Sequence, residues 1–572
     1  MIGTYAAVLA VCVASLAIGQ AAIALCGVRR WSWLAPAVGL ALLCAICWGT
    51  VRLPGDGWVA ALAATALAIA SVLYLRGRLE GGGEALRAGW PVALIALAAA
   101  SLPFIVEGHF GVLGTSFNPD MSQHLLAADR LAHGEGSQLL RQGYPLGPHA
   151  IVVALHRGFG IGLVQGFGGL TVAVAVLATL TALTAFREQP SAIRIPAALV
   201  VGLAYMVASY FAQGAFKETM QALFFLAFVL ALRESSQDPQ WRTLALRFVP
   251  AALLAAGSIY TYSFPGLIWL AGALVVWLAL ERKLPVRSLL LAAAAFAVLV
   301  APEVGRMIDF HSFETFDPNG PGLGNLFGQI SPFEGLGIWP SGDFRLTPGA
   351  GAVPALGYYL GAAYASILLV YGLVLCWRRR ENALIAGFAA AALAYAAARI
   401  GGTPYTAAKA IEIGAPLAAL VIALPLLRRP VAWLCLLAAG GCSLLALANA
   451  PVGPTSYSPA LTGLRADVGE GPTLVLAPRQ LLEDEHGTPY IAWELRGGRV
   501  CIEASEDAGD HPPRGVRFVI AESSGGPAPF PGLRRLRVAP PYVLWESAPP
   551  APGRGQCPLI AVRQARQGSP NR

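Results

Sequence analysis

Lysine is scarce in this sequence, which has three lysines among its 40 basic residues, and charged residues of all kinds make up only 13% of the chain. Soluble domains contain about 25% charged residues, so the composition excludes an ordinary soluble protein. With 56% hydrophobic residues, the 572-residue chain is typical of a polytopic α-helical membrane protein. In such a protein a net charge of +8 reports membrane orientation, and no nucleic-acid partner is expected.

Motifs of soluble catalysis are also missing. No glycine-rich nucleotide motif follows a predicted strand, and no Ser/His/Asp arrangement is recognisable. Seven of the nine cysteines lie in or beside apolar runs, where they act as small buried residues. The other two, Cys501 and Cys557, lie in a polar tail, and an oxidising exterior would allow a disulfide between them, although the sequence leaves this pairing open.

Long apolar runs dominate the chain instead, near the roughly 20 residues that cross a bilayer. They predict fourteen transmembrane helices, at residues 4–27, 31–52, 57–76, 89–106, 160–186, 194–212, 218–233, 247–263, 265–282, 288–303, 354–377, 382–399, 409–427 and 430–449. Residues 451–572 are rich in charge, Pro and Gly. The strand-like segments PTLVLAP, VRFVIAE and YVLWE, with a helical PRQLLEDEH, predict a small C-terminal α/β domain there.

The positive charges are distributed unequally between the two sides of the membrane. Alternate short loops hold 18 Lys and Arg residues, against nine on the opposite side before residue 450. Because cytoplasmic loops are enriched in cations, this predicts a multi-pass inner (plasma) membrane protein with extracytoplasmic N- and C-termini. The Arg-for-Lys bias and heavy Ala, Gly and Pro usage indicate a GC-rich bacterial genome.

Two of the three lysines, Lys217 and Lys409, fall at outward membrane boundaries, where the same rule disfavours cations, and Arg306 and Arg399 join them. Each of these side chains could simply reach lipid headgroups. Four such cations together predict a binding site for an anionic lipid substrate, such as one that carries a phosphate.

The stretch FNPDMSQHLLAADR lies in the first long outward loop, residues 107–148. Its Asn-Pro pair opens a helix, and i, i+4 spacing places Asp120 and His124 on one face as candidate catalytic residues. The plainer interpretation is that Asp120 complements the helix N-terminus and that His124 pairs with it or contacts headgroups. Asp129 is expected to be a surface residue.

Other outward loops supply polar and aromatic candidates. GYPLGPHAIVVAL, residues 143–155, predicts a re-entrant or interfacial helix, and residues 304–353 are expected to form an ordered functional loop. Four residues of that loop allow a metal site, although a solvated loop fits them better: Asp309, His311, Glu314 and Asp317. The candidate substrate-binding residues are Tyr144, His149, Glu218, Tyr262, Trp339, Asp343, Arg345 and Tyr405.

The segments NPDMSQH, YPLGPH, QGAFKE, GLGIWPSGDFR and PYTAAKA occur in this order before the soluble tail. Together with the long first outward loop, they resemble the bacterial GT-C superfamily of membrane glycosyltransferases. The resemblance covers most of residues 89–450. Residues 1–88 would then be additional N-terminal transmembrane helices, and residues 451–572 an extracytoplasmic domain.

The resemblance implies a polyprenyl-phosphate-linked sugar as donor at the outer membrane face and Asp120 as the general base. The family often has two adjacent acids here, whereas Pro119 precedes Asp120 in this chain, so a divalent metal stays an open alternative and no other cofactor is implied. The residue types suit this chemistry. One carboxylate can accept the proton of an acceptor hydroxyl, and cations can stabilise a departing phosphate.

The sequence therefore predicts an inverting glycosyltransferase that moves a sugar to a cell-envelope glycan or lipid acceptor, with an arabinofuranosyltransferase as one candidate. Two alternatives stay open: a transporter or flippase for a lipid-linked substrate, and an O-antigen-type glycan polymerase or ligase. Nearly all ionisable residues fall at span ends or in loops, which counts against a transport pathway through the membrane midplane.

Overall fold

The computed structural model describes residues 1–134, 138–281, 285–310, 322–351, 353–424, 431–469, 471–483, 487–522, 527–547 and 554–556. The chain divides into two compact units. The helical unit comprises Met1–Asn118, Leu131–Gly134 and Leu140–Gly453, and the tail unit comprises Pro119–Arg130, Glu135–Leu139 and Pro454–Arg572.

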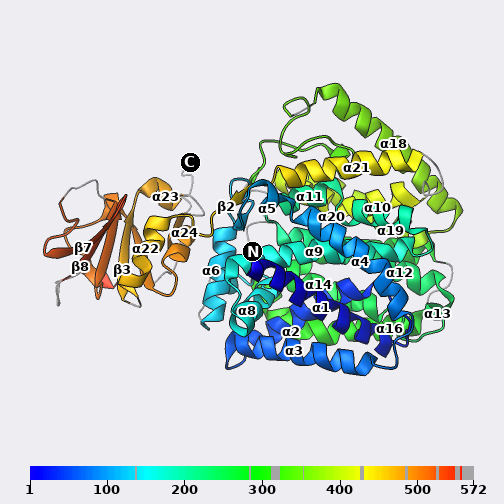
Figure 1. The fold of residues 1–572 in the computed structure, drawn as a ribbon, viewed down its shortest axis with the longest axis horizontal. Coiled ribbons are helices and arrows are strands. Elements are labelled where there is room, and N and C mark those ends of the chain that lie inside the picture. The colour runs from blue at the N-terminus through cyan, green and yellow to red at the C-terminus, as the bar shows by residue number, and fades with distance from the viewer. Residues whose placement is uncertain are drawn as a thin grey trace. The chain divides into compact units, whose positions relative to one another are not determined.

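The helical unit consists almost wholly of α-helices (Figure 1). Its first half contains α1 (Ile2–Leu25), α2 (Ala35–Val51), α3 (Asp56–Leu75), α4 (Gly82–Ala100), α5 (Leu102–Val106), α8 (Gly147–Phe159), α9 (Leu163–Phe186), α10 (Ser191–Gly202) and α11 (Tyr205–Ala212). Its second half contains α12 (Phe216–Gln237), α13 (Pro239–Arg242), α14 (Val249–Tyr262), α15 (Leu267–Leu280), α16 (Val286–Val300), α17 (Val304–Asp309), α18 (Ala355–Arg378), α19 (Asn382–Gly401), α20 (Pro404–Ala423) and α21 (Val431–Ala448).

Within the described residues, each of the fourteen predicted spans overlaps one of these helices or a consecutive pair. Seven helical segments of the described chain are long and apolar enough to cross a membrane, or up to eight if α10 and α11, bent by 52° at their junction, count as one. The prediction of a polytopic α-helical membrane chain is therefore confirmed, whereas the count of fourteen spans stays a prediction.

Small and apolar residues explain how closely these helices pack. In α9, 94% of an 18-residue apolar stretch is buried, as expected for a helix that other helices surround. α1 and α2 approach through a glycine from each helix. A Cβ on Gly39 would lie 1.8 Å from the carbonyl oxygen of Ser15, and one on Gly19 would lie 1.9 Å from that of Ala35, so only glycine fits at either position.

The short α8 begins at Gly147, just after the predicted turn, and has 13 residues, too few to cross a bilayer as an α-helix. This length fits the predicted re-entrant or interfacial helix. β1 (Val112–Leu113) pairs antiparallel with β2 (Val452–Gly453), which joins the loop 107–148 to the C-terminal end of the helical unit.

The tail unit has the predicted α/β fold. Its five-stranded sheet has the order β4-β3-β6-β8-β7, with β3 parallel to β4 and β6, and β8 antiparallel to β6 and β7. The strands are β3 (Pro472–Ala477), β4 (Arg499–Ala504), β6 (Phe518–Glu522), β7 (Leu533–Ala539) and β8 (Tyr542–Ser547), and a separate pair joins β5 (Pro513–Arg514) to β9 (Arg554–Gln556). The helices are α22 (Pro459–Val468), α23 (Arg479–Glu483) and α24 (Gly487–Glu494).

Two features of the tail unit bear on the sequence predictions. Cys501 forms a disulfide, whereas its predicted partner Cys557 lies outside the described residues, so the pairing stays a prediction. Most of α6 (Met121–Ala132) belongs to this unit, although the sequence division counted the whole first outward loop with residues 89–450. Asp129 is only 7% exposed. The expectation of a surface residue is therefore wrong, because the carboxyl group lies within electrostatic range of Arg465 and Arg496.

Candidate functional site

A buried ion pair joins α12 and α20. Lys409 Nζ lies 3.0 Å from Glu218 Oε1, and the two residues are 8% and 4% exposed. Thr403 and Pro404 start α20, and the Thr403 hydroxyl accepts a hydrogen bond from the Thr406 backbone N–H. Lys409 therefore sits in the second turn of a capped helix, while Glu218 lies in the first turn of α12, where the helix dipole favours a negative charge.

Aromatic side chains surround the Lys409 ammonium group. Nζ lies 4.3 Å from the ring centroid of Tyr405, a distance at which the negative face of a ring attracts a cation. Tyr210 and Tyr262 also lie within electrostatic range of Lys409. The hydroxyl of Tyr210 has no hydrogen-bond partner in the part of the chain that the structure describes. The group is thus a charged pair in an aromatic cage with unused hydrogen-bonding capacity.

A second buried carboxyl lies one turn along α20 from Lys409. Glu412 is 0% exposed, and neither carboxyl oxygen has a hydrogen-bond partner among the described residues. Glu218 and Lys409 both act on it electrostatically. Burial of a carboxyl group without a donor is costly, so an unmet acceptor is expected to serve a ligand or a proton. The sequence interpretation missed Glu412, although an acid inside an apolar span is a signal for function.

Lys217, beside Glu218 at the start of α12, opposes the helix dipole and so does not stabilise the helix there. Its Nζ lies 4.1 Å from the ring centroid of Tyr144, and it acts electrostatically on Glu218. Lys217, Glu218, Tyr405, Lys409 and Glu412 are called the Lys409 cluster below. Two lysines flagged separately by the sequence thus lie near one carboxylate.

His149, at the start of α8, packs against Tyr144. The two rings meet edge to face with centroids 6.4 Å apart, and the His149 ring also packs 5.4 Å from Phe167 and 5.6 Å from Phe216. Burial lowers the pKa of His149 to about 3. The imidazole is therefore neutral at physiological pH and fills an aromatic packing site rather than adding positive charge to the cluster.

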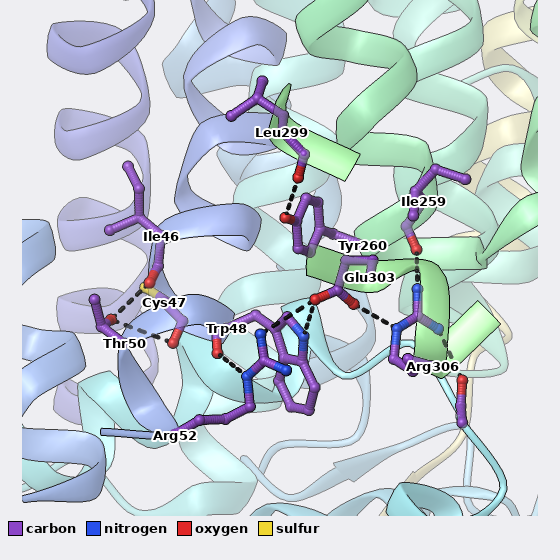
Figure 2. A network of polar contacts seen from close by, with 11 residues as sticks. Ile46, Cys47, Trp48, Thr50, Arg52, Ile259, Tyr260, Leu299, Glu303 and Arg306 are labelled. Atoms are coloured by element: carbon purple, nitrogen blue, oxygen red, sulfur yellow. Dashed lines mark hydrogen bonds and ion pairs between the residues drawn. The ribbon is translucent and has the colours of Figure 1, made fainter. Parts of the chain in front are cut away.

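The two predicted arginines do not join the Lys409 cluster. The Arg306 guanidinium donates to Glu303 and Ile259, as Figure 2 shows, and also to Gly143 and Ser263. Arg399 is exposed near the C-terminal end of α19, where the described residues give it neither an ion pair nor a hydrogen bond. Of the four cations predicted to bind phosphate, the structure therefore brings together Lys217 and Lys409.

The GLGIWPSGDFR loop is held by contacts within the segment and with residues of other segments. Trp339 is 0% exposed and packs edge to face on Tyr358, with centroids 5.0 Å apart. Arg345 donates to Asp343 at 2.7 Å and lies over the rings of Phe117 and Phe327, at 4.1 and 4.7 Å. In this conformation these groups hold the loop in place and leave no open aromatic platform at Trp339.

Asp120 and His124 belong to the tail unit. Asp120 directly precedes α6, and its carbonyl oxygen accepts from the backbone N–H groups of Gln123 and His124, at 3.0 and 3.2 Å. Asp120 therefore starts the predicted helix. Within the described residues there is no group of three or more metal-ligating side chains. Of the loop residues that allowed a metal site, His311, Glu314 and Asp317 lie outside the described part of the chain.

No model of a known protein family matches the sequence, and no curated protein matches it. Among solved structures, the chain is similar to the crystal structure of ArnT from Cupriavidus metallidurans in the apo state. The identity is 15% and the TM-score 0.47, over 80% of this chain and 97% of that one. A likeness this distant carries no chemistry across, so the activity has to be inferred from the residues of this chain.

Proposed function

We propose that the protein is a GT-C type glycosyltransferase of a bacterial inner membrane that transfers a sugar from a polyprenyl-phosphate donor to a cell-envelope glycan or lipid acceptor. The observation that carries this proposal is the Lys409 cluster, in which two of the chain's three lysines flank one buried carboxylate. Lysine is a compact cation that suits a phosphate group. Buried aromatic rings and an unmet carboxyl beside the lysines suit the polar head of a sugar-linked lipid.

The reaction needs one proton acceptor and positive charge at the leaving group. The acceptor hydroxyl oxygen forms the new bond to the anomeric carbon while the bond from this carbon to the phosphate oxygen breaks. The phosphate keeps the electron pair, Lys217 and Lys409 stabilise its negative charge, and Asp120 takes the hydroxyl proton. Direct displacement inverts the anomeric centre. The assignment of Asp120 rests on its sequence motif.

The first test compares the parent protein with Asp120→Asn in lipid nanodiscs, using a panel of polyprenyl-phosphate sugars and a glycan acceptor. We expect the parent to consume one donor and Asp120→Asn to transfer about 10²- to 10⁴-fold more slowly. The exposed Glu107 of the same outward loop provides the matched control, because Glu107→Gln removes a carboxylate without touching the motif. Equal transfer by Asp120→Asn and the parent would show that the base is another residue.

A transporter or flippase is a second candidate because Glu412 is a buried acid within a predicted span. The same donors separate the two functions when they are placed in sealed vesicles. A flippase moves the intact lipid between leaflets without breaking the sugar–phosphate bond, whereas a glycosyltransferase releases polyprenyl phosphate. Release from a diphosphate-linked oligosaccharide alone would instead indicate a glycan polymerase or ligase.

A further inference from the structure

A closed set of polar contacts lies around Glu303, in the 3₁₀ turn Ala301–Glu303 that follows α16 (Figure 2). Glu303 is 0% exposed. One carboxyl oxygen accepts from Trp48 Nε1 at 2.8 Å and from Arg52 Nη2 at 3.2 Å, and the other accepts from Arg306 Nε at 2.5 Å. Trp48, Arg52, Glu303 and Arg306 are called the Glu303 clamp. It joins the end of α2 to the segment that leads into the long outward loop.

Arg306 extends the clamp to two further segments. Its Nη1 donates to the carbonyl oxygen of Gly143 at 2.8 Å and to Ser263 Oγ at 3.3 Å, and its Nη2 donates to the carbonyl oxygen of Ile259 at 3.0 Å. Gly143 has a φ of +67°, and a Cβ there would lie 2.3 Å from the Arg306 carbonyl oxygen. The Gly143 turn is therefore pressed against α17 in a conformation that glycine alone adopts without strain.

The residue after this turn is Tyr144. Its ring centroid lies 4.1 Å from Lys217 Nζ, in a cation–π contact. The ring is held on its other sides by Phe310, at 6.3 Å, and by His149, at 6.4 Å. A cation–π contact depends on where the ring face lies. Any shift of the Gly143 turn would therefore move Tyr144 and change where Lys217 presents its charge.

We infer that Glu303 is a positioning residue for Lys217. Glu303 acts through Arg306, the Gly143 turn and the Tyr144 ring, and it is held in place by Trp48 of α2 and by Arg52, the residue that follows α2. This inference rests on the proposed function, in which Lys217 stabilises the donor phosphate. It gives Arg306 a role other than phosphate binding, since its donors serve the clamp. It also gives the additional N-terminal helices a role in the reaction, because α2 and the residue that caps its C-terminal end supply two of the four clamp residues.

The test uses Trp48→Phe and Glu303→Gln in the transfer assay with the donor that the parent consumes. Trp48→Phe keeps an aromatic ring and removes one donor to Glu303, so we expect the KM for the lipid donor to rise about fivefold, the factor that one hydrogen bond supplies. Glu303→Gln loses the charge that orients Arg306 and is expected to raise this KM further. Because Lys217 is proposed to stabilise charge that develops on the leaving phosphate, part of the effect is expected to fall on kcat in both variants. The lipid-exposed Trp58→Phe of α3 is the matched control and is expected to change neither constant.

A background variant separates positioning from general stability. Lys217→Met removes the group that the clamp is inferred to position, so adding Trp48→Phe to it should raise the donor KM no further. A merely structural role predicts that Trp48→Phe lowers both the transfer rate and the unfolding temperature, and that it does so by the same factor with and without Lys217→Met. That pattern, or an unchanged donor KM in Trp48→Phe and Glu303→Gln, overturns the inference even if Glu303→Gln folds poorly. Failure of the parent to use any polyprenyl-phosphate sugar would instead overturn the proposed function.

Discussion

The two buried charge networks of the helical unit differ in how completely their polar atoms are satisfied. In the Glu303 clamp both carboxyl oxygens have donors, and Arg306 donates from all three of its nitrogens. In the Lys409 cluster, Glu218 takes the ammonium group, and Glu412 has no hydrogen-bond partner among the described residues. A network whose polar atoms all have hydrogen-bond partners has little capacity left for a ligand. A network with unpartnered buried atoms can gain hydrogen bonds when a ligand binds. We therefore assign the clamp to scaffolding and the cluster to binding.

Among the proposed variants, Lys409→Met is expected to have the largest effect on stability and transfer. This change leaves Glu218 and Glu412 buried near each other without the cation that acts on both. Breaking a buried pair from one side costs about 3–5 kcal/mol, so we expect a large fall in the unfolding temperature in detergent together with loss of transfer. A Lys409→Met protein as stable as the parent would show that the pair is not charged or not buried in the membrane.

A double variant serves as the control for this prediction. Lys409→Met with Glu218→Gln removes both charges of the pair and leaves a neutral, hydrogen-bonding side chain on α12. Replacing a buried pair as a whole is often nearly neutral for stability. The double variant should therefore recover much of the unfolding temperature and none of the transfer, which separates the role of Lys409 in binding from its role in folding.

Another buried carboxyl, that of Glu334, is intermediate between the two networks in how completely its oxygens are hydrogen-bonded. Glu334 lies in the 3₁₀ turn Pro332–Leu336, within the loop predicted to face outward, and is 2% exposed. One oxygen accepts from the Ser331 backbone N–H at 3.1 Å, and the other has no partner in the described chain. Burial raises the pKa of Glu334 well above its ordinary value of 4.5. The Ser331 hydrogen bond opposes this shift, and the negative charge of Asp343 adds to it.

This raised pKa predicts a pH effect of moderate size. Above pH 4.5 the unfolded chain loses the Glu334 proton while the folded chain keeps it, so the folded state binds more protons and its stability falls as pH rises towards the folded pKa. We expect Glu334→Gln to flatten this part of the curve of unfolding temperature against pH. Glu107→Gln, on an exposed acid, should leave the curve unchanged. An identical slope in Glu334→Gln and the parent would contradict the raised pKa.

The sequence predicted the helices well because each apolar run is a local signal. Each of the fourteen predicted ranges overlaps a helix of the described chain, and short β-branched and aromatic runs predicted β3, β6 and β8 of the tail unit but not β4 or β7. The scarcity of lysine also made Lys217 and Lys409 predictable as functional candidates. These two residues are 192 positions apart, and both act electrostatically on Glu218. A rare residue in a disfavoured place is a signal that needs no knowledge of packing.

The partners of each cation could not be predicted, because they come from distant parts of the chain. Arg306 carried the same signal as the lysines, yet its donors are taken by Gly143, Ile259, Ser263 and Glu303. Nothing in the local sequence shows that these groups converge. The same holds for Trp339, a candidate substrate-binding residue whose ring is fully buried. Sequence patterns located the unusual residues, and only the fold could sort bound side chains from available ones.

Arg399 tests this distinction with the smallest expected effect. The same argument predicted Arg399 and Lys409 to bind the donor phosphate. Arg399, however, is exposed and has neither an ion pair nor a hydrogen bond in the described part of the chain. An exposed residue away from caps, pairs and cavities contributes within about 0.5 kcal/mol. Arg399→Ala should therefore keep the unfolding temperature of the parent and change the donor KM by less than about twofold, the factor that this energy allows. A several-fold rise in that KM, measured beside Lys217→Met, would mean that Arg399 reaches the donor phosphate once the lipid is bound. Unsatisfied polar groups in the unliganded protein would then mark only part of the binding site.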